Sequence, residues 1–220
     1  MTVLAIDTSG EYASVVLLEP DGKLTESALH APDGHSTHLF GEIQTLLRRA
    51  GVRLEDVDCF AAAAGPGSFT GVRVALAAAK GLAMALGKPM AAVSNLWALA
   101  WFGEAPLRAV AIDARRGNTY TALYNAALEP VMPEILTIAL DPWLASLTEA
   151  GGEVEIVTAH PAHLAGHTLP CPLRIVAPEH LARAVAHIAL AEAVQVDPAL
   201  TDANYVRRAD AEMKWVDRVS

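Results

Sequence analysis

The chain opens with three short hydrophobic runs that are rich in β-branched residues and separated by turn residues. Reversals are indicated by Thr8-Ser9-Gly10 and by Pro20-Asp21-Gly22, because small polar residues, proline and glycine favour tight turns. Strands that are so closely connected form an antiparallel meander. The predicted strands are Val3–Ile6, Tyr12–Glu19 and Lys23–Leu29.

After residue 34 the period of the pattern changes. Apolar residues from Leu39 to Ala50 recur at helical spacing, with Ser36 as the expected N-cap and Gly51 as the expected stop. A continuous apolar run then predicts a buried strand, and an alanine-rich run predicts a second helix that ends at Gly87. The predicted elements are a helix over 39–50, a strand over 57–64, a helix over 72–86, a strand over 89–93 and a helix through Trp97 and Trp101.

A second β-hairpin follows Glu104-Ala105-Pro106, so this segment is the expected boundary between two parts of the chain. The elements predicted beyond it are strands over 108–112, 119–124 and 154–159 and a helix over 180–193. The repeated hairpin opening predicts an α/β protein with two related lobes. We expect a first lobe at 1–103, a compressed second lobe at 104–195 and a tail at 196–220 that packs back on the lobes.

Composition narrows the class of protein. Hydrophobic residues make up 53% of the 220 residues, and Arg73 and Lys80 interrupt the longest apolar run, so a packed core is expected rather than a membrane span. No basic flank precedes Asp7, which argues against a signal peptide, and Cys59 and Cys171 do not suggest a disulfide framework. These features predict a cytoplasmic protein without membrane contact. The net charge of −9 disfavours direct binding of nucleic acid, which usually requires a basic surface.

Two segments have the residue types of a phosphate site. The turn Asp7–Gly10 follows a strand, and the loop AGPGSFTG at 64–71 precedes a helix, where backbone amides and the helix dipole favour an anion. The loop is not a Walker A motif, since Lys80 lies far along the helix. The candidate nucleotide- or phosphate-binding residues are Asp7, Ser9, Gly65, Gly67, Ser68 and Thr70. The alternative is that both segments are turns that need these residue types for backbone geometry alone.

Charged side chains also mark the tip of the second hairpin. Arg115 and Arg116 could contact a phosphate, a carboxylate or the acidic face of a partner, or could be solvated turn residues. The histidines His30, His35 and His38 lie close together, but their spacing does not supply a third ligand, so no metal site is predicted.

The two long helices of the first half could form an interface with another subunit. Small alanine side chains on the second helix alternate with leucines, and apolar residues lie on more than one of its faces. The candidate interface residues are Leu39, Ile43, Leu46, Val72, Ala75, Leu76, Ala79, Leu82 and Ala83. The alternative is that both helices only cover their own sheet.

Taken together, these segments resemble the TsaB (YeaZ) family. The matching stretches, in order, are VLAIDTSGEYASVVLL, HSTHL, AGPGSFTGVRVALAAAKGLA, IDARRGNTYTALY and NYVRRADAE. The resemblance implies an actin-like ATPase (ribonuclease H-like) fold of two related lobes with mixed sheets flanked by helices. It also implies a noncatalytic subunit that contacts the catalytic paralogue TsaD through helices matching 36–50 and 70–86, together with the ATPase TsaE. The complex puts threonylcarbamoyl on the tRNA adenosine beside the anticodon, so tRNA is expected to be reached indirectly. Whether Arg115 and Arg116 contact tRNA or the partner directly stays open.

The resemblance leaves several points open. Family members also self-associate, so a homodimer is an expected alternative to the heterodimer. No cofactor of its own is expected, although ATP or ADP at the interface with the partner remains open. The runner-up function is an independent nucleotide-dependent kinase or ATPase that uses Asp7 and the 64–71 loop, whereas no nucleophile and base pair by spacing to support a peptidase. Residues 130–178 match nothing in the family pattern.

Overall fold

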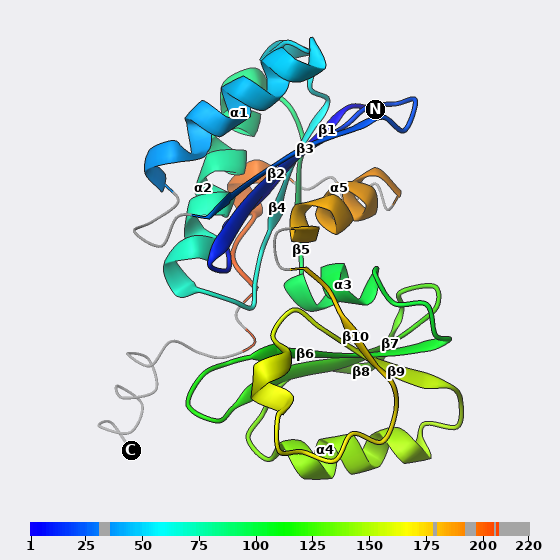
Figure 1. Ribbon diagram of the computed structural model, residues 1–220. Helices are drawn as coiled ribbons and strands as arrows, with labels where there is room; N and C mark the ends of the chain where they lie inside the picture. Colours follow the sequence, from blue (N-terminus) through cyan, green and yellow to red (C-terminus); the bar gives the residue numbers. More distant parts are fainter. Residues whose placement is uncertain (31–35, 178–179, 192–196, 205, 207–220) are drawn as a thin grey trace.

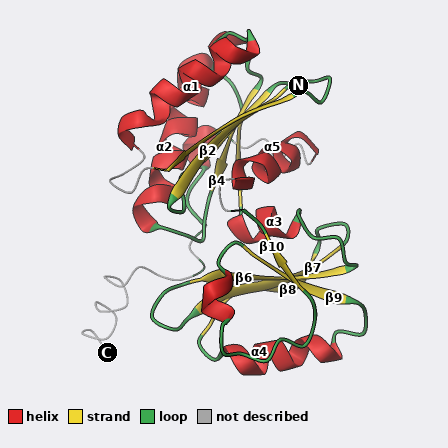
Figure 2. Ribbon diagram, in the orientation of Figure 1, coloured by secondary structure: helices red, strands yellow, loops and turns green. Residues whose placement is uncertain are grey.

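The chain folds into two lobes, each built on a five-stranded mixed sheet with helices against it (Figure 1). The computed structural model describes residues 1–30, 36–177, 180–191, 197–204 and 206. His35, the end of the helix predicted to 193 and most of the predicted tail fall outside the described residues. Figure 2 shows the helices gathered around the two sheets. The α/β prediction with mixed sheets flanked by helices is confirmed.

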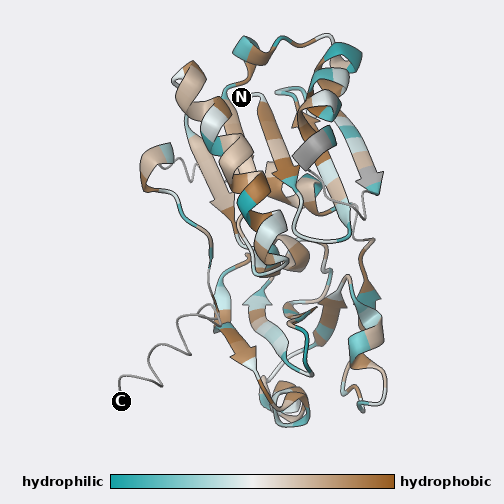
Figure 3. Cartoon of the chain, turned by 90° about the vertical axis from the view of Figure 1, so that its left-hand side faces the viewer, coloured by the Kyte–Doolittle hydropathy of each residue, from teal (hydrophilic) through white to brown (hydrophobic). Residues whose placement is uncertain are grey.

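The first sheet has the order β3-β2-β1-β4-β5. Its strands are β1 (Val3–Asp7), β2 (Tyr12–Leu18), β3 (Leu24–His30), β4 (Cys59–Ala63) and β5 (Met90–Val93). The first three form the predicted antiparallel meander, and β4 and β5 join parallel to β1. Alternate residues of β1 face opposite sides, and both sides are buried, since helices cover both faces. The central strands of this lobe are accordingly hydrophobic in colour in Figure 3.

Two long helices cover one face of the first sheet. They are α1 (Ser36–Ala50) and α2 (Phe69–Leu86). The second begins three residues before the predicted start, because the Ser68 hydroxyl accepts a hydrogen bond from the amide of Gly71 and caps it. It ends at Gly87, whose φ of 62° is left-handed. By length and composition α2 could cross a membrane, but seven of its residues are buried in the lobe, as in the core helix of a globular domain.

The second sheet repeats the topology of the first. Its strands are β6 (Leu107–Asp113), β7 (Thr119–Asn125), β8 (Pro130–Thr137), β9 (Val154–Thr158) and β10 (Leu173–Ile175). Read from β8, the order is β8-β7-β6-β9-β10, with the same antiparallel meander followed by two parallel strands. The equivalence of β1–β5 and β6–β10 confirms the prediction of two related lobes.

The segment 130–178, which the family pattern does not match, contains β8, β9 and β10 and the helix α4 (Leu140–Ser146). Only β9 is predicted from the sequence. The strand β8 is missed because it lies at the sheet edge with Pro130 and Pro133, and prolines argue against a central strand. Short 3-10 helices complete the fold: η1 (Leu54–Asp56), η2 (Leu147–Glu149), η3 (Pro161–Leu164) and η5 (Pro198–Leu200).

Two helices lie between the sheets. The helix α3 (Asn95–Ala100) packs on the second sheet, and α5 (Leu181–Ala191) packs on β1, β2 and β4 of the first. Their buried residues belong to one hydrophobic cluster that includes strands of both sheets. The first sheet ends at Val93 and the second begins at Leu107, whereas α5, which lies within the range expected for the second lobe, covers the first sheet. A boundary drawn from the sequence cannot show that α5 packs back on the first sheet, because this packing depends on which face of a sheet is left uncovered by the other helices.

Candidate functional site at the junction of the lobes

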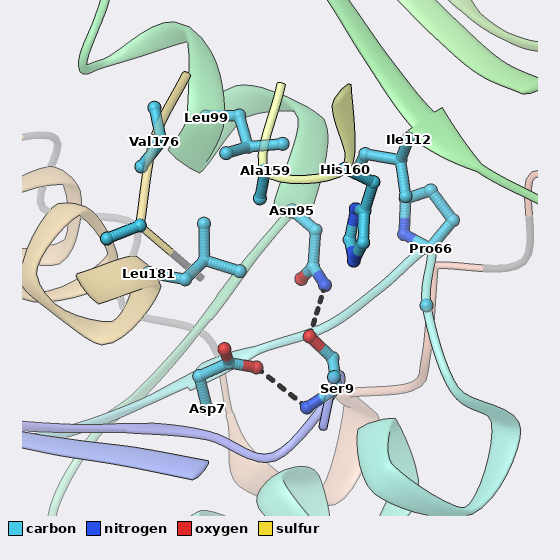
Figure 4. A pocket seen from close by; sticks show the side chains of 13 residues that line it. Asp7, Ser9, Pro66, Asn95, Leu99, Ile112, Ala159, His160, Val176 and Leu181 are labelled. Atoms are coloured by element: carbon cyan, nitrogen blue, oxygen red, sulfur yellow. Dashed lines mark hydrogen bonds between the residues drawn. The ribbon is translucent and has the colours of Figure 1, made fainter. Parts of the chain in front are cut away.

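The turn after β1 places a buried carboxylate where the two lobes meet. Asp7 is 2% exposed, and its Oδ1 accepts a hydrogen bond from the amide of Ser9 at 2.8 Å. This is the Asx-type turn that the alternative prediction describes. Figure 4 shows Asp7 and Ser9 on one side of a small pocket, with Ile112 and His160 of the second lobe opposite them.

The glycine loop at 64–71 is bonded to this turn. The amide of Ser68 donates to the carbonyl of Ser9 at 2.8 Å, and the Thr8 hydroxyl donates to the carbonyl of Gly71 at 2.6 Å. A Cβ at Gly67 would lie 3.0 Å from Ser9, so the glycine allows the close approach of the two segments. The structure thus brings the two predicted phosphate segments together.

A third element, which sequence reasoning misses, joins them. Asn95 at the start of α3 is 2% exposed, and its Oδ1 accepts from the amide of Gly65 at 3.1 Å. Its Nδ2 donates to the Ser9 hydroxyl at 2.7 Å (Figure 4), and its backbone amide donates to the carbonyl of Gly65 at 2.8 Å. A single asparagine after the capping Ser94 has no distinctive sequence signal. We call this bonded set of Asp7, Ser9, Gly65, Ser68, Gly71 and Asn95 the junction.

The junction bonds four of the backbone amides that could face a phosphate. The amides of Ser9, Gly65, Ser68 and Gly71 all donate within the chain. Of the predicted phosphate residues, Gly67, Ser68 and Thr70 are exposed, while Asp7, Ser9 and Gly65 are buried. These four amides are therefore not available to an anion, because an anion needs amides that are not already bonded.

A cleft of about 690 Å³ lies beside the junction, between Ser9–Tyr12 and Gly67–Phe69 of the first lobe and Ile112–Arg115 and Ala159–His163 of the second. His160 and His163 line it. Burial, and then the neighbouring His163, lower the pKa of His160 below its ordinary value. His160 is therefore expected to remain neutral at pH 7.

The two arginines of the second hairpin lie at the tip, where both adopt left-handed φ angles of 65° and 56°. Both are exposed. Arg115 lies 3.7 Å from a carboxylate oxygen of Asp113 and lines the cleft. Within the described residues no cluster of three His, Cys, Asp or Glu side chains that could hold a metal is found.

Most of the predicted interface residues lie inside the lobe. The following eight are buried in the first lobe's own core: Leu39, Ile43, Leu46, Val72, Ala75, Leu76, Ala79 and Ala83. Leu82 is half-buried against the same cluster. The prediction that these buried side chains form the partner interface is therefore corrected. They pack on the sheet of their own lobe and do not lie on an outer face. A helix pattern identifies a hydrophobic stripe but not what covers it.

The outer face of the same helices carries different residues. Three large apolar side chains are exposed there, namely Phe40 at 52%, Phe69 at 59% and Met84 at 60%. Between Phe69 and Met84 along α2, Ala77 and Gly81 are exposed at helical spacing. The Arg73 guanidinium lies 3.3 Å over the Phe69 ring. We call Phe40, Phe69, Arg73, Ala77, Gly81 and Met84 the outer helical face.

Two equivalent lobes around a cleft, with a β-hairpin turn and a glycine loop between them, define a protein with the actin-like ATPase fold. Component A of (R)-2-hydroxyglutaryl-CoA dehydratase from Acidaminococcus fermentans shares this fold, with a TM-score of 0.53 at 10% identity over 89% of this chain and 100% of that one.

Closer relatives identify the family. The chain is 34% identical over 99% of its length to "tRNA threonylcarbamoyladenosine biosynthesis protein TsaB" of Bacillus subtilis, and it covers 99% of that protein. It superimposes on YeaZ from Pseudomonas aeruginosa with a TM-score of 0.77 at 31% identity, over 93% and 99% of the two chains. Residues 29–150 match the model of the TsaD family, tRNA N6-adenosine threonylcarbamoyltransferase. The chain belongs to the TsaB (YeaZ) family, as the sequence motifs predict.

Proposed function

We propose that this chain is a noncatalytic subunit of the machinery that forms threonylcarbamoyladenosine on tRNA, and that it works by binding a TsaD-like catalytic paralogue. The name of its full-length relative in Bacillus subtilis, and that of the Escherichia coli relative matched over 57% of this chain, support the process. The match of residues 29–150 to the TsaD family supports the choice of partner, because two subunits of one fold can pair through equivalent surfaces.

The outer helical face carries this proposal. On α2 the exposed Phe69 and Met84 flank the small residues Ala77 and Gly81, so a facing helix could approach closely. On α1, which covers the same face of the sheet, Phe40 is exposed as well. Large exposed apolar side chains gathered on one surface are typical of interaction sites in monomers. Residues 36–50 and 70–86 thus supply the interface through their outward side chains, and the buried side chains hold the helices in place.

The junction supports the noncatalytic role. Its backbone amides are bonded within the chain, so the geometry that would polarise a phosphate is absent among these described groups. We propose that the chain holds no nucleotide by itself, and that any ATP or ADP is bound where the partner completes the site.

The remaining partners follow from the same proposal. A TsaE-like ATPase is expected to join the complex, tRNA is expected to be held by the catalytic subunit, and the complex is expected to act in the cytoplasm. A homodimer through the outer helical face would compete with the heterodimer, because both would cover the same apolar groups.

The test is threonylcarbamoyl transfer to tRNA in vitro with TsaD, TsaE and the supply of carbamoyl-adenylate, with and without this chain. Activity that requires the chain, together with no activity from the chain alone, is the expected result. Full activity without it, or transfer by the chain alone, would overturn the proposal.

A second function rests on the cleft, whose volume of about 690 Å³ is within the range of ligand pockets. An independent kinase or ATPase would bind ATP saturably in isolation and lose that binding in Asp7→Ala. Calorimetric titration of ATP with magnesium into the isolated chain decides between the two functions. The proposed function predicts no saturable heat for the wild type.

A further inference from the structure

The C-terminal segment Asp197–Asn204 contacts both lobes. In Figure 1 its orange-to-red trace runs beside α2 and descends toward the second sheet. It begins with the short helix η5, where the Asp197 carboxylate accepts from the amide of Ala199 at 2.8 Å. The segment therefore has its own local order before it reaches the lobes.

On the first lobe the segment is fixed at two places. The Lys80 ammonium of α2 donates to the carbonyls of Ala199 at 3.2 Å and Thr201 at 3.3 Å. Further along, the amide of Asn204 donates to the carbonyl of Ala64 at 2.8 Å, directly before the junction glycine Gly65. A lysine ammonium has three donors, so Lys80 can hold both carbonyls of the segment at once.

On the second lobe the segment is held through the side chain of Asn204. The Asn204 Nδ2 donates to Glu134 Oε2 of β8 at 2.6 Å, and the Tyr124 hydroxyl of β7 donates to Glu134 Oε1 at 2.6 Å. Bonds to an ionised carboxylate are about twice as strong as neutral ones. Burial, together with the Glu134 charge, raises the pKa of Tyr124, so its hydroxyl keeps its proton and remains a donor.

Asn204 therefore binds the first lobe through its backbone and the second lobe through its side chain. In two-lobed proteins the angle between the lobes is commonly set by a ligand in the cleft. We propose that residues 197–204 form a strap that holds the two lobes of this chain at a fixed angle, with Asn204 as its latch and Glu134 as the acceptor. In this chain the angle between the lobes is then set by contacts within the protein and does not require a ligand in the cleft.

The strap also links the lobe angle to α2. Lys80 lies on this helix between Ala77 and Met84 of the outer helical face. A partner on that face would touch a helix to which the second lobe is tied through Asn204. This consequence rests on the proposed function, whereas the strap itself is tested on the isolated chain.

The experiment measures the distance between the lobes by paired spin labels. In a Cys171→Ser background, labels are attached at Gln44→Cys on α1 and Ala145→Cys on α4, both of which are exposed positions. The buried Cys59 is protected from labelling, since burial raises the pKa of its thiol to about 11. The labelled chain is expected to give one narrow distance distribution.

Two variants remove the latch and one provides a matched control. Asn204→Ala deletes the donor, and Glu134→Gln leaves one side-chain oxygen for two donors. Glu129→Gln makes the same chemical change in the β7–β8 turn, where Glu129 accepts only from Asn125 of the same lobe among the bonds described. We expect a shift to longer distances and loss of the single narrow peak in both latch variants, and the unchanged distribution in the control.

The unchanged distribution in folded Asn204→Ala and Glu134→Gln would overturn the strap. Circular dichroism shows whether each variant is folded. Should Asn204→Ala not fold, Lys80→Met takes its place, because it removes the other anchor and predicts the same shift. A double-mutant cycle adds a second readout: latch residues that act together give a double variant with no larger shift than either single change.

Discussion

A Cβ placed on Gly71 would lie 1.9 Å from the carbonyl oxygen of Thr8. Real Cβ atoms do not approach backbone oxygens so closely, so the first turn of α2 can meet the β1–β2 turn only through a glycine. The Thr8 hydroxyl also donates a hydrogen bond to the carbonyl of Gly71, which holds the two segments at this close distance. The glycine at position 71 is therefore required by packing between two segments 63 residues apart.

Gly71→Ala is expected to destabilise the chain by about 3 kcal/mol or more, above the usual cost of overpacking, because backbone must move at both segments. Thermal or urea unfolding measures it. The matched control is Gly81→Ala in the same helix, where a Cβ would meet nothing within 4 Å. Higher helix propensity predicts that this control is neutral or stabilised by up to about 1 kcal/mol. Equal stabilities for the two variants would contradict the packing argument.

Asn95→Ala is expected to cost about 2–4 kcal/mol, because it leaves the buried amide of Gly65 without its acceptor and the Ser9 hydroxyl without its donor. Ser9→Ala removes one of these bonds and is expected to cost less. In a double-mutant cycle the two changes should be nonadditive, since they share one hydrogen bond. Additive losses in urea unfolding would show that the junction is not a connected network.

Charges on the outer helical face are expected to abolish binding of TsaD without unfolding the chain. Gly81→Glu and Met84→Glu place a carboxylate on exposed positions, and Ala145→Glu on the exposed face of α4 is the control. Analytical gel filtration with TsaD, combined with a thermal melt of each variant alone, measures both effects. Normal complex formation by folded Gly81→Glu and Met84→Glu would remove this face from the interface.

A charge at Ala79 provides a contrasting result. This side chain is fully buried in the core of the first lobe, so Ala79→Glu is expected to destabilise the fold itself. Lost pairing in this variant would say nothing about an interface. A melting temperature equal to that of the wild type would contradict the core position of Ala79.

Glu155 is expected to make stability depend on acid pH. Burial by itself would raise the pKa of this carboxyl, but the amides of Ala105 and Glu104 and the Arg174 guanidinium outweigh burial and lower it. The folded chain therefore binds this proton more weakly than the unfolded chain. Its stabilisation is complete above the ordinary value of 4.5 and is lost as the pH falls through the lower folded value.

Glu155→Gln measures this contribution. The difference in unfolding free energy between wild type and variant is expected to be largest near neutral pH and to shrink below about pH 4.5. Glu149→Gln, at an exposed position outside this set of bonds, should leave the pH profile unchanged. A difference that stays constant from neutral to acid pH would show that Glu155 acts through packing rather than charge.

Much of the fold follows from local pattern. The β1–β2–β3 meander, the strand β4 and the helices α1 and α2 are predicted to within a few residues, because alternation, helical periodicity and turn residues are local signals. The strand β8 and the helix α4 are not predicted. Prolines at 130 and 133 conceal an edge strand, and α4 has only seven residues, too few for a clear period.

The sequence by itself determined the family, the two-lobed α/β class and the identity of the two turns that meet at the junction. Tertiary structure alone decided that the Ser68 amide of one turn donates to the Ser9 carbonyl of the other and that Asn95 bonds to both turns. It also decided that α5 returns to the first sheet, and that Ala79 faces inward while Met84 faces outward. The physical reason is distance along the chain. Capping, turns and periodicity act over a few residues, whereas Asn95 meets Ser9 across 86 residues and Asn204 meets Glu134 across 70, through contacts that exist only after the lobes have packed.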